Sequence, residues 1–141
     1  MTTTVAALRT FSGHTGGVWA CAYSRNGRLC VSASADNTLK IWDVATGATK
    51  CTLSGHSGRV YCCAFSPPDP ASGTSSMIVS GSSDNTLKIW DADTGKEKYT
   101  LSGHSGGVGS CAFSPDGTTV LSGSGDTTLK LWDSVAPVHH I

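Results

Sequence analysis

The sequence has few charged residues, and neither sign is concentrated in one region. Its 141 residues are 14% charged, and ten lysines and arginines balance ten aspartates and glutamates. A basic patch or stripe is the usual electrostatic footprint of a protein that binds nucleic acid or a membrane surface, and none is visible here. We therefore expect neither a nucleic-acid partner nor a membrane partner.

Long apolar runs are also missing. The N-terminus, MTTTVAALRTFSG, lacks the apolar segment of a signal peptide, and no stretch approaches the length needed to span a bilayer. We expect a soluble, intracellular protein of the cytoplasm, with the nucleus left open as a second location.

Motifs that carry chemistry are equally scarce. The sequence has no phosphate-binding glycine-rich loop followed by Lys-Ser/Thr and no paired-histidine metal motif, and His139-His140 is interpreted as a tail. No CxxC pair begins a zinc or redox site. We expect no cofactor, no metal and no enzymatic activity.

The six cysteines are better explained as structural thiols. Cys21, Cys63 and Cys111 occupy one repeated position, on segments that end in an aromatic residue, as small buried apolar residues do. Cys30, Cys51 and Cys62 are scattered. An intracellular compartment would keep all six reduced, so a disulfide framework is not expected.

The sequence does contain repeats. FSGHTGGVWACAYSR at 11–25 returns as LSGHSGRVYCCAFSP at 53–67 and LSGHSGGVGSCAFSP at 101–115. Successive Gly-His motifs are 42 and 48 residues apart, and successive Trp-Asp motifs are 48 and 42 apart. Both longer intervals cross 67–76, where PPDPASGTSS carries a six-residue insertion suited to a surface loop.

Within each unit the apolar pattern has a period of two, which predicts strands. Three short runs recur, for example VYCCAF, MIVSGS and TLKIW in the second unit, and a fourth, ATKCTL or EKYTL, precedes the next Gly-His. Turn signals such as Asn26-Gly27 and Asp84-Asn85 separate the runs. The sequence therefore predicts an all-β chain in which each unit is a four-stranded antiparallel sheet.

These motifs resemble the WD40 repeat family. Gly-His stands at 13–14, 55–56 and 103–104, and Trp-Asp at 42–43, 90–91 and 132–133, over almost the whole chain. The resemblance implies three β-propeller blades in a single repeat domain spanning 1–141. We expect blade units at 12–53, 54–101 and 102–141, with 5–11 an outer strand that completes another blade.

Each unit also contains a serine, a histidine and an aspartate, which two readings explain. A hydrolase would use one Ser-His-Asp set, but a catalytic centre is needed once and not three times. The resemblance instead implies a structural tetrad in which the Trp indole bonds Ser, Ser bonds His and His bonds Asp, so that each buried polar group gains a partner. The three tetrads are His14, Ser32, Asp36 and Trp42; His56, Ser80, Asp84 and Trp90; and His104, Ser122, Asp126 and Trp132.

Function is then expected on the rims of the propeller. In the WD40 family, protein partners often dock on one end face, beside the valine that opens the innermost strand and before the hairpin Asp. The residue types there that dominate interfaces are Trp19, Arg59 and Tyr61, with Ser83 beside them, whereas the third unit has only glycines. The alternative is that Trp19 and Tyr61 merely cover a neighbouring blade.

Three blades cannot close a ring, because propellers of this family usually have about seven. We expect a homo-oligomer in which residues 5–11 of one chain complete the Trp132 blade of the next. Two copies would give six blades and three would give nine; a different WD40 chain, or a fragment or designed set of blades from a longer propeller, are the alternatives. The sequence names no partner, pathway or organism.

Overall fold

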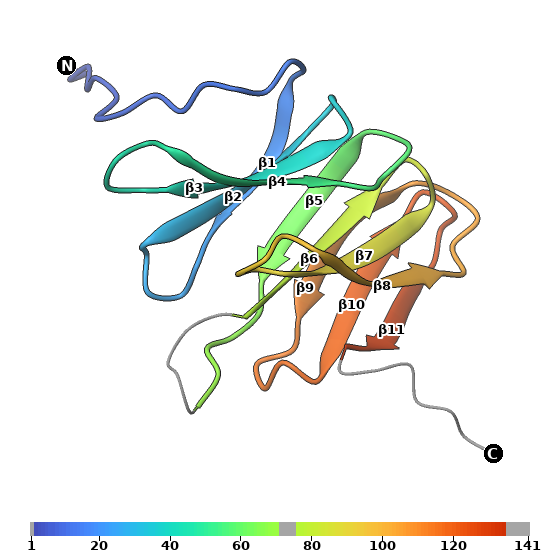
Figure 1. The fold of residues 1–141 in the computed structure, drawn as a ribbon. Helices are drawn as coiled ribbons and strands as arrows, with labels where there is room; N and C mark the ends of the chain where they lie inside the picture. Colours follow the sequence, from blue (N-terminus) through green and yellow to red (C-terminus); the bar gives the residue numbers. More distant parts are fainter. Residues whose placement is uncertain (1, 71–75, 135–141) are drawn as a thin grey trace.

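The computed structural model describes residues 2–70 and 76–134, which form three antiparallel β-sheets (Figure 1). The first sheet has the order β1 (Val18–Tyr23), β2 (Leu29–Ser34), β3 (Thr38–Asp43) and β4 (Thr49–Ser54). The second has β5 (Val60–Phe65), β6 (Met77–Ser82), β7 (Thr86–Asp91) and β8 (Glu97–Ser102). The third has β9 (Val108–Phe113), β10 (Thr119–Ser124) and β11 (Leu129–Asp133).

The all-β prediction is confirmed, and the strand bounds agree with the period-two runs. The third sheet has three strands within the described residues, and the place of a fourth falls on 135–141, outside them. His139-His140 and part of the 67–76 insertion lie outside the described residues as well.

The turns between the second and third strands of each sheet require a left-handed backbone. Asn37 and Asn85 adopt φ of 75° and 74° there, which asparagine tolerates well. Thr127 takes the same place in the third sheet with φ of 76°, although a β-branched residue is disfavoured in this region. The turn geometry is thus common to all three sheets even where the sequence departs from Asp-Asn.

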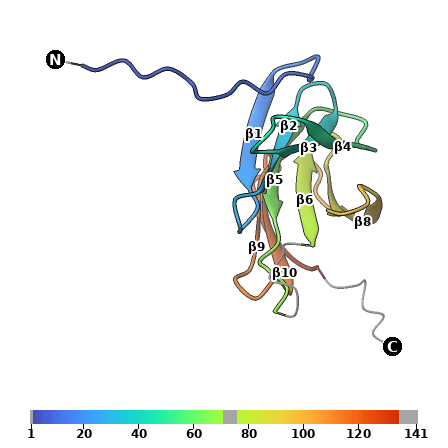
Figure 2. The same cartoon turned by 60° about the vertical axis from the view of Figure 1, so that its left-hand side comes forward.

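The sheets stack side by side, with β5 between β1 and β9 (Figures 1 and 2). One apolar cluster joins the first sheet to the second, and it includes Val31, Leu39, Ile41, Val60 and Trp90. A second cluster joins the second sheet to the third, and it includes Val79, Leu87, Ile89, Val108 and Val120. Each interface pairs the Trp-bearing face of one sheet with the opposite face of the sheet before it.

One prediction about local structure is wrong for this single chain, and another, which concerns a second chain, stays a prediction. Cys21, expected to be buried like Cys63 and Cys111, is exposed because no sheet covers that side of the first sheet. Residues 5–11, which we call the N-terminal arm, form no strand and run away from the sheets at their start (Figure 2). A strand needs a neighbour that supplies ladder hydrogen bonds, and no described strand of this chain pairs with the arm. Its exchange into another chain remains a prediction.

Candidate functional site

The structure brings the four residues of each tetrad together in one chain of hydrogen bonds. In the second sheet, Trp90 Nε1 donates to Ser80 Oγ at 2.8 Å, and His56 Nε2 lies 2.7 Å from the same oxygen. His56 Nδ1 lies 2.8 Å from Asp84 Oδ2. The same three contacts recur at 2.6 to 2.8 Å in the first sheet and at 2.8 Å in the third.

The aspartate of each tetrad accepts more hydrogen bonds than sequence reasoning identified. Asp84 also accepts from the Thr86 hydroxyl at 2.6 Å, the Thr86 backbone N–H at 2.9 Å and the Ser57 backbone N–H at 3.1 Å. The signal that could have found this is the threonine two residues after each hairpin aspartate: Thr38, Thr86 and Thr128.

These contacts determine the charge of the tetrad. Burial by itself raises the pKa of Asp84, but hydrogen bonds from Thr86 and His56 outweigh it and lower the pKa to about 2. The pKa values of Asp36 and Asp126 also lie below their usual range. Burial lowers the pKa of His56, and the opposing effect of Asp84 does not reverse this. The neutral His56 therefore donates a hydrogen bond from Nδ1 to Asp84 and accepts one from the Ser80 hydroxyl at Nε2.

The Ser-His-Asp hydrogen bonds have the order found in a hydrolytic triad, but the serine is less accessible than a catalytic serine must be. Ser80 is 0% exposed and Ser122 is 1% exposed, and each hydroxyl also accepts an indole N–H. A nucleophile must reach a substrate carbonyl, so a buried oxygen under an indole ring is poorly placed for attack. The geometry therefore favours a structural role, in which the tetrad links strands to loops by hydrogen bonds, rather than a catalytic role.

The predicted partner-binding residues lie together at the end of the sheets that carries the hairpin aspartates. The Trp19 and Tyr61 rings meet edge to face, with centroids 6.0 Å apart and planes at 83°. Ser83 donates its backbone N–H to the Arg59 carbonyl at 2.8 Å. Trp19 remains 58% exposed, so its contact with Tyr61 leaves most of the indole accessible.

Glycines extend this end face into the third sheet. A methyl group built on Gly107 would lie 3.6 Å from the Tyr61 ring, which places the bare backbone next to the aromatic pair. A methyl group on Gly109 would meet nothing within 4 Å. We call Trp19, Arg59, Tyr61, Ser83 and these glycines the end face.

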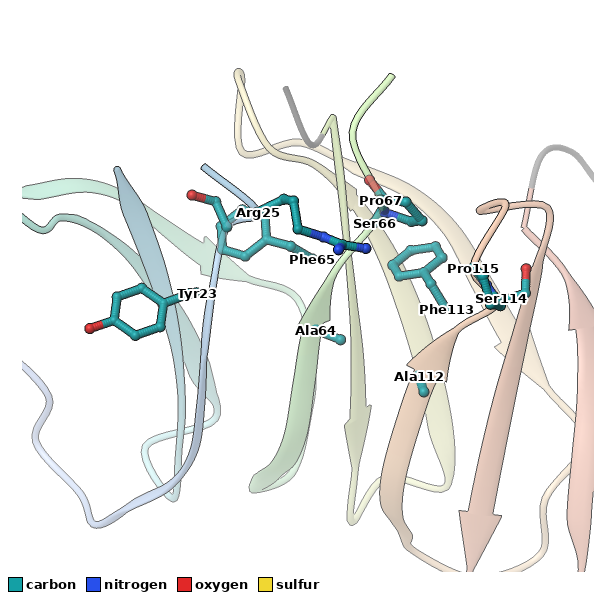
Figure 3. A pocket seen from close by; sticks show the side chains of 11 residues that line it. Tyr23, Arg25, Ala64, Phe65, Ser66, Pro67, Ala112, Phe113, Ser114 and Pro115 are labelled. Carbon is teal, nitrogen blue, oxygen red and sulfur yellow. The ribbon is translucent and has the colours of Figure 1, made fainter. Parts of the chain in front are cut away.

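A pocket of ≈ 550 Å³ opens where β1, β5 and β9 end, and sequence reasoning did not identify it (Figure 3). The side chains of Phe65, Phe113, Pro67 and Pro115 line it, and Arg25 extends from the first sheet toward Phe113. Arg25 is the one charged side chain among the eleven lining residues. The signal in the sequence was the repeated aromatic-Ser-Pro that follows the innermost strand of the second and third units.

Within residues 2–70 and 76–134 the structure has no cluster of three or more side chains suited to bind a metal ion. In the same ranges, no helix is long and apolar enough to cross a membrane. All six cysteines are free thiols, and burial raises the pKa of Cys63 and Cys30 above the ordinary range of a thiol.

Small antiparallel sheets, stacked along their innermost strands and each bound by a Trp-Ser-His-Asp tetrad, define a set of β-propeller blades. The chain belongs to the WD40 family: the model described as "WD domain, G-beta repeat" matches residues 6–43, 47–91 and 95–133. Each matched segment begins ahead of the Gly-His motif, so the repeat in the sequence is offset by one strand from the sheet in space.

Curated relatives match the chain over short segments. It is 50% identical over 40 residues to Eukaryotic translation initiation factor 3 subunit I of Schizosaccharomyces pombe, covering 28% of this chain and 12% of that protein. It is 48% identical over 42 residues to Small ribosomal subunit protein RACK1 of Saccharomyces cerevisiae, covering 30% and 13%. The chain thus spans about an eighth of the length of the relatives it matches.

Proposed function

We propose that this protein is a non-catalytic protein-interaction scaffold of the WD40 type, which binds protein partners or peptides at its end face. The observation that carries the proposal is the pair formed by the exposed Trp19 and the half-buried Tyr61 beside Arg59, bordered by the backbone of Gly107 and Gly109. Tryptophan, tyrosine and arginine supply most of the binding energy at protein interfaces. The adjoining glycines allow a peptide backbone to approach closely.

Two further observations support the scaffold class. Ser80 and Ser122, the serines that a hydrolase would use in the second and third units, are buried and accept indole N–H groups. The relatives carry names of components of larger assemblies, a translation initiation factor subunit and a small ribosomal subunit protein. From these names we propose that the chain acts in the cytoplasm, with the nucleus left open. Because its basic and acidic residues balance without a basic block, we propose that it binds neither nucleic acid nor membranes.

We also propose that the scaffold completes its ring with a second copy of the chain, by exchange of residues 5–11 into the blade of Trp132. Two copies give six blades, a smaller departure from the usual ring than nine. Closure by strand exchange would be a head-to-tail contact, which forms a ring when the rotation permits.

The end-face function is tested by a triple variant, Trp19→Ala, Arg59→Ala and Tyr61→Ala. Each hot-spot residue is worth on the order of 2 kcal/mol at an interface. The variant should therefore lose the proteins that the parent captures from a cell extract, while its circular dichroism is unchanged. The matched control is Arg25→Ala at the opposite end, which should capture the same proteins as the parent. Equal capture by the triple variant would move the site elsewhere.

A further inference from the structure

Among residues 2–70 and 76–134, the stack of sheets has two apolar faces that no described residue covers, one at each end. The open face of the first sheet carries Val18, 57% exposed, and Tyr23, 70% exposed. The open face of the third sheet carries Leu121, Leu129 and Leu131, which are 42%, 67% and 70% exposed. These are large side chains on regular strands, where soluble monomers rarely expose a contiguous patch.

The interior of the same chain shows what covers such faces. Val31, Leu39 and Ile41 stand at the positions of the three open leucines, and all are 0% exposed against the second sheet. Val79, Leu87 and Ile89 repeat this against the third sheet, again at 0%. Val60 and Val108, which correspond to Val18, are 0% exposed. Inside the chain, a face like the open face of the third sheet therefore packs on a face like the open face of the first sheet.

The N-terminal arm already lies where the outer strand of a preceding sheet would lie. Arg9 donates to the carbonyls of Thr46 and Ala45 at 3.0 and 2.6 Å, and it packs on Gly47. Phe11 meets the Trp42 ring edge to face at 5.6 Å.

Strand β4 makes the equivalent contacts with the second sheet. Cys51 and Leu53 pack on Gly95, which stands in the second unit where Gly47 stands in the first. Leu53 also shares a cluster with Trp90, as Phe11 shares a contact with Trp42. The first family match begins at residue 6, as the others begin just before β4 and β8. Residues 9–11 thus occupy the position of an outer strand, although no described strand pairs with them.

Between the arm and the first sheet lies a cavity of ≈ 530 Å³. It is lined by Arg9, Phe11, Val18, Tyr23 and Trp42, among others. We propose that this cavity receives the third sheet of a second copy of the chain: Leu121, Leu129 and Leu131 of that copy cover Val18 and Tyr23, and the arm pairs beside its β11. The inference rests on the proposed self-assembly and adds a face-to-face interface to the exchanged strand.

A glycine position gives this interface a specific fit. In the second sheet, a methyl group on Gly81 would come within 2.6 Å of Val108 Cγ1, so the missing side chain makes room for that valine. Gly123 is the equivalent glycine of the third sheet, and Val18 is the equivalent valine of the first. On Gly123 the same methyl group would meet Ser110 Oγ alone within 4 Å, which leaves space for Val18 of the partner copy.

The test uses sedimentation analysis of the full chain and two variants. One variant, Leu129→Lys with Leu131→Lys, disables the open face of the third sheet. The other, Val18→Lys with Tyr23→Lys, disables that of the first. All four side chains are more than half exposed, so both variants should keep the parent's circular dichroism.

The parent should form a discrete assembly at tens of micromolar, and each variant alone should be a monomer. A mixture of the two variants should form a one-to-one dimer, because one intact pair of faces remains between them. A monomeric parent would overturn the inference, as would a dimer formed by either variant alone, since that would indicate like faces pairing. If a lysine variant loses structure, the same two residues changed to glutamine replace it, and the mass of the parent still decides.

The end-face function is assayed on the same preparations. Trp19→Ala should retain the assembly, because Trp19 lies on the end face, and should lose partner capture. A parent that is monomeric but still captures partners refutes only the inference. A Trp19→Ala variant that assembles and still captures partners refutes only the end-face function.

Discussion

At the residue scale, each tetrad uses both the donor and the acceptor capacity of a buried serine hydroxyl in hydrogen bonds. The Ser80 hydroxyl accepts a hydrogen bond from the Trp90 indole and donates one to His56 Nε2, and the serine is buried, so it is not available to solvent or substrate. Removing one partner leaves the others buried and unsatisfied, which costs more than the bond itself contributes.

We predict that Trp90→Phe lowers the free energy of unfolding by about 1 to 3 kcal/mol, because it deletes the N–H donor and keeps most of the apolar bulk. Urea denaturation of parent and variant measures this. Trp19→Phe, at an exposed position, is the matched control and should change stability by less than about 0.5 kcal/mol. Equal midpoints for Trp90→Phe and the parent would contradict a stabilising role for the tetrad.

The tetrads also predict how stability depends on pH. The pKa of His56 is lowered from 6.5 by burial, so below about pH 6.5 the unfolded chain binds a proton that the folded chain resists. The pKa of Asp84 is lowered from 3.8 to about 2, so its contribution is present above 3.8 and is lost as the pH falls through about 2. Both effects have the same sign.

We therefore expect urea midpoints to fall from pH 7.5 to 5.5 and to fall further toward pH 3. The ring resonances of His56 in the folded protein should titrate below the usual range of a histidine. A midpoint that rises on acidification from pH 7.5 to 5.5 would contradict the assignment of a neutral His56.

At the scale of elements, the fit between neighbouring sheets depends on small residues at the interface. Gly81 on β6 leaves room for Val108 on β9, and an added methyl group would lie 2.6 Å from both Val108 Cγ1 and Cys62 Sγ. Ala33 occupies the corresponding position on β2 and is buried at 0%. The interface between the first and second sheets thus accommodates a methyl group at this position, whereas the interface between the second and third sheets does not.

We predict that Gly81→Ala destabilises the protein by about 1 to 3 kcal/mol through overpacking, because a β-branched valine has little freedom to move aside. Gly109→Ala is the matched control, since its methyl group would meet nothing within 4 Å, and it should be neutral or slightly stabilising. Thermal or urea unfolding measures both. Equal stability of the two variants would show that the sheets separate at little cost.

At the scale of the whole molecule, three sheets present two open faces and an arm anchored in an outer-strand position. Whatever covers these faces stabilises the folded chain by mass action, so assembly and stability are linked. The end face lies apart from both open faces, and the tests of binding and of assembly therefore address different residues. A scaffold built this way would carry one end face per copy, and a ring of two copies would present two.

The sequence by itself determined the elements and the membership of the tetrads. Alternating apolar residues, turn dipeptides and a 42- to 48-residue repeat are local signals, and they predicted strands whose bounds the structure reproduces. The resemblance to WD40 repeats supplied the order of contacts within each tetrad. The threonines that bond Asp36, Asp84 and Asp126 were visible as a repeated spacing, but only the structure showed that their hydroxyls donate to these aspartates.

Only the tertiary structure decided which faces are covered. Cys21 and Cys63 have the same local sequence context, yet Cys21 is exposed and Cys63 is partly buried, because a sheet lies across from one and not from the other. Residues 5–11 read as a strand but form none in the single chain, and the anchoring of Arg9 to the Ala45–Thr46 turn was not predicted. Burial and strand pairing depend on what stands opposite a segment, which periodicity along the chain does not contain.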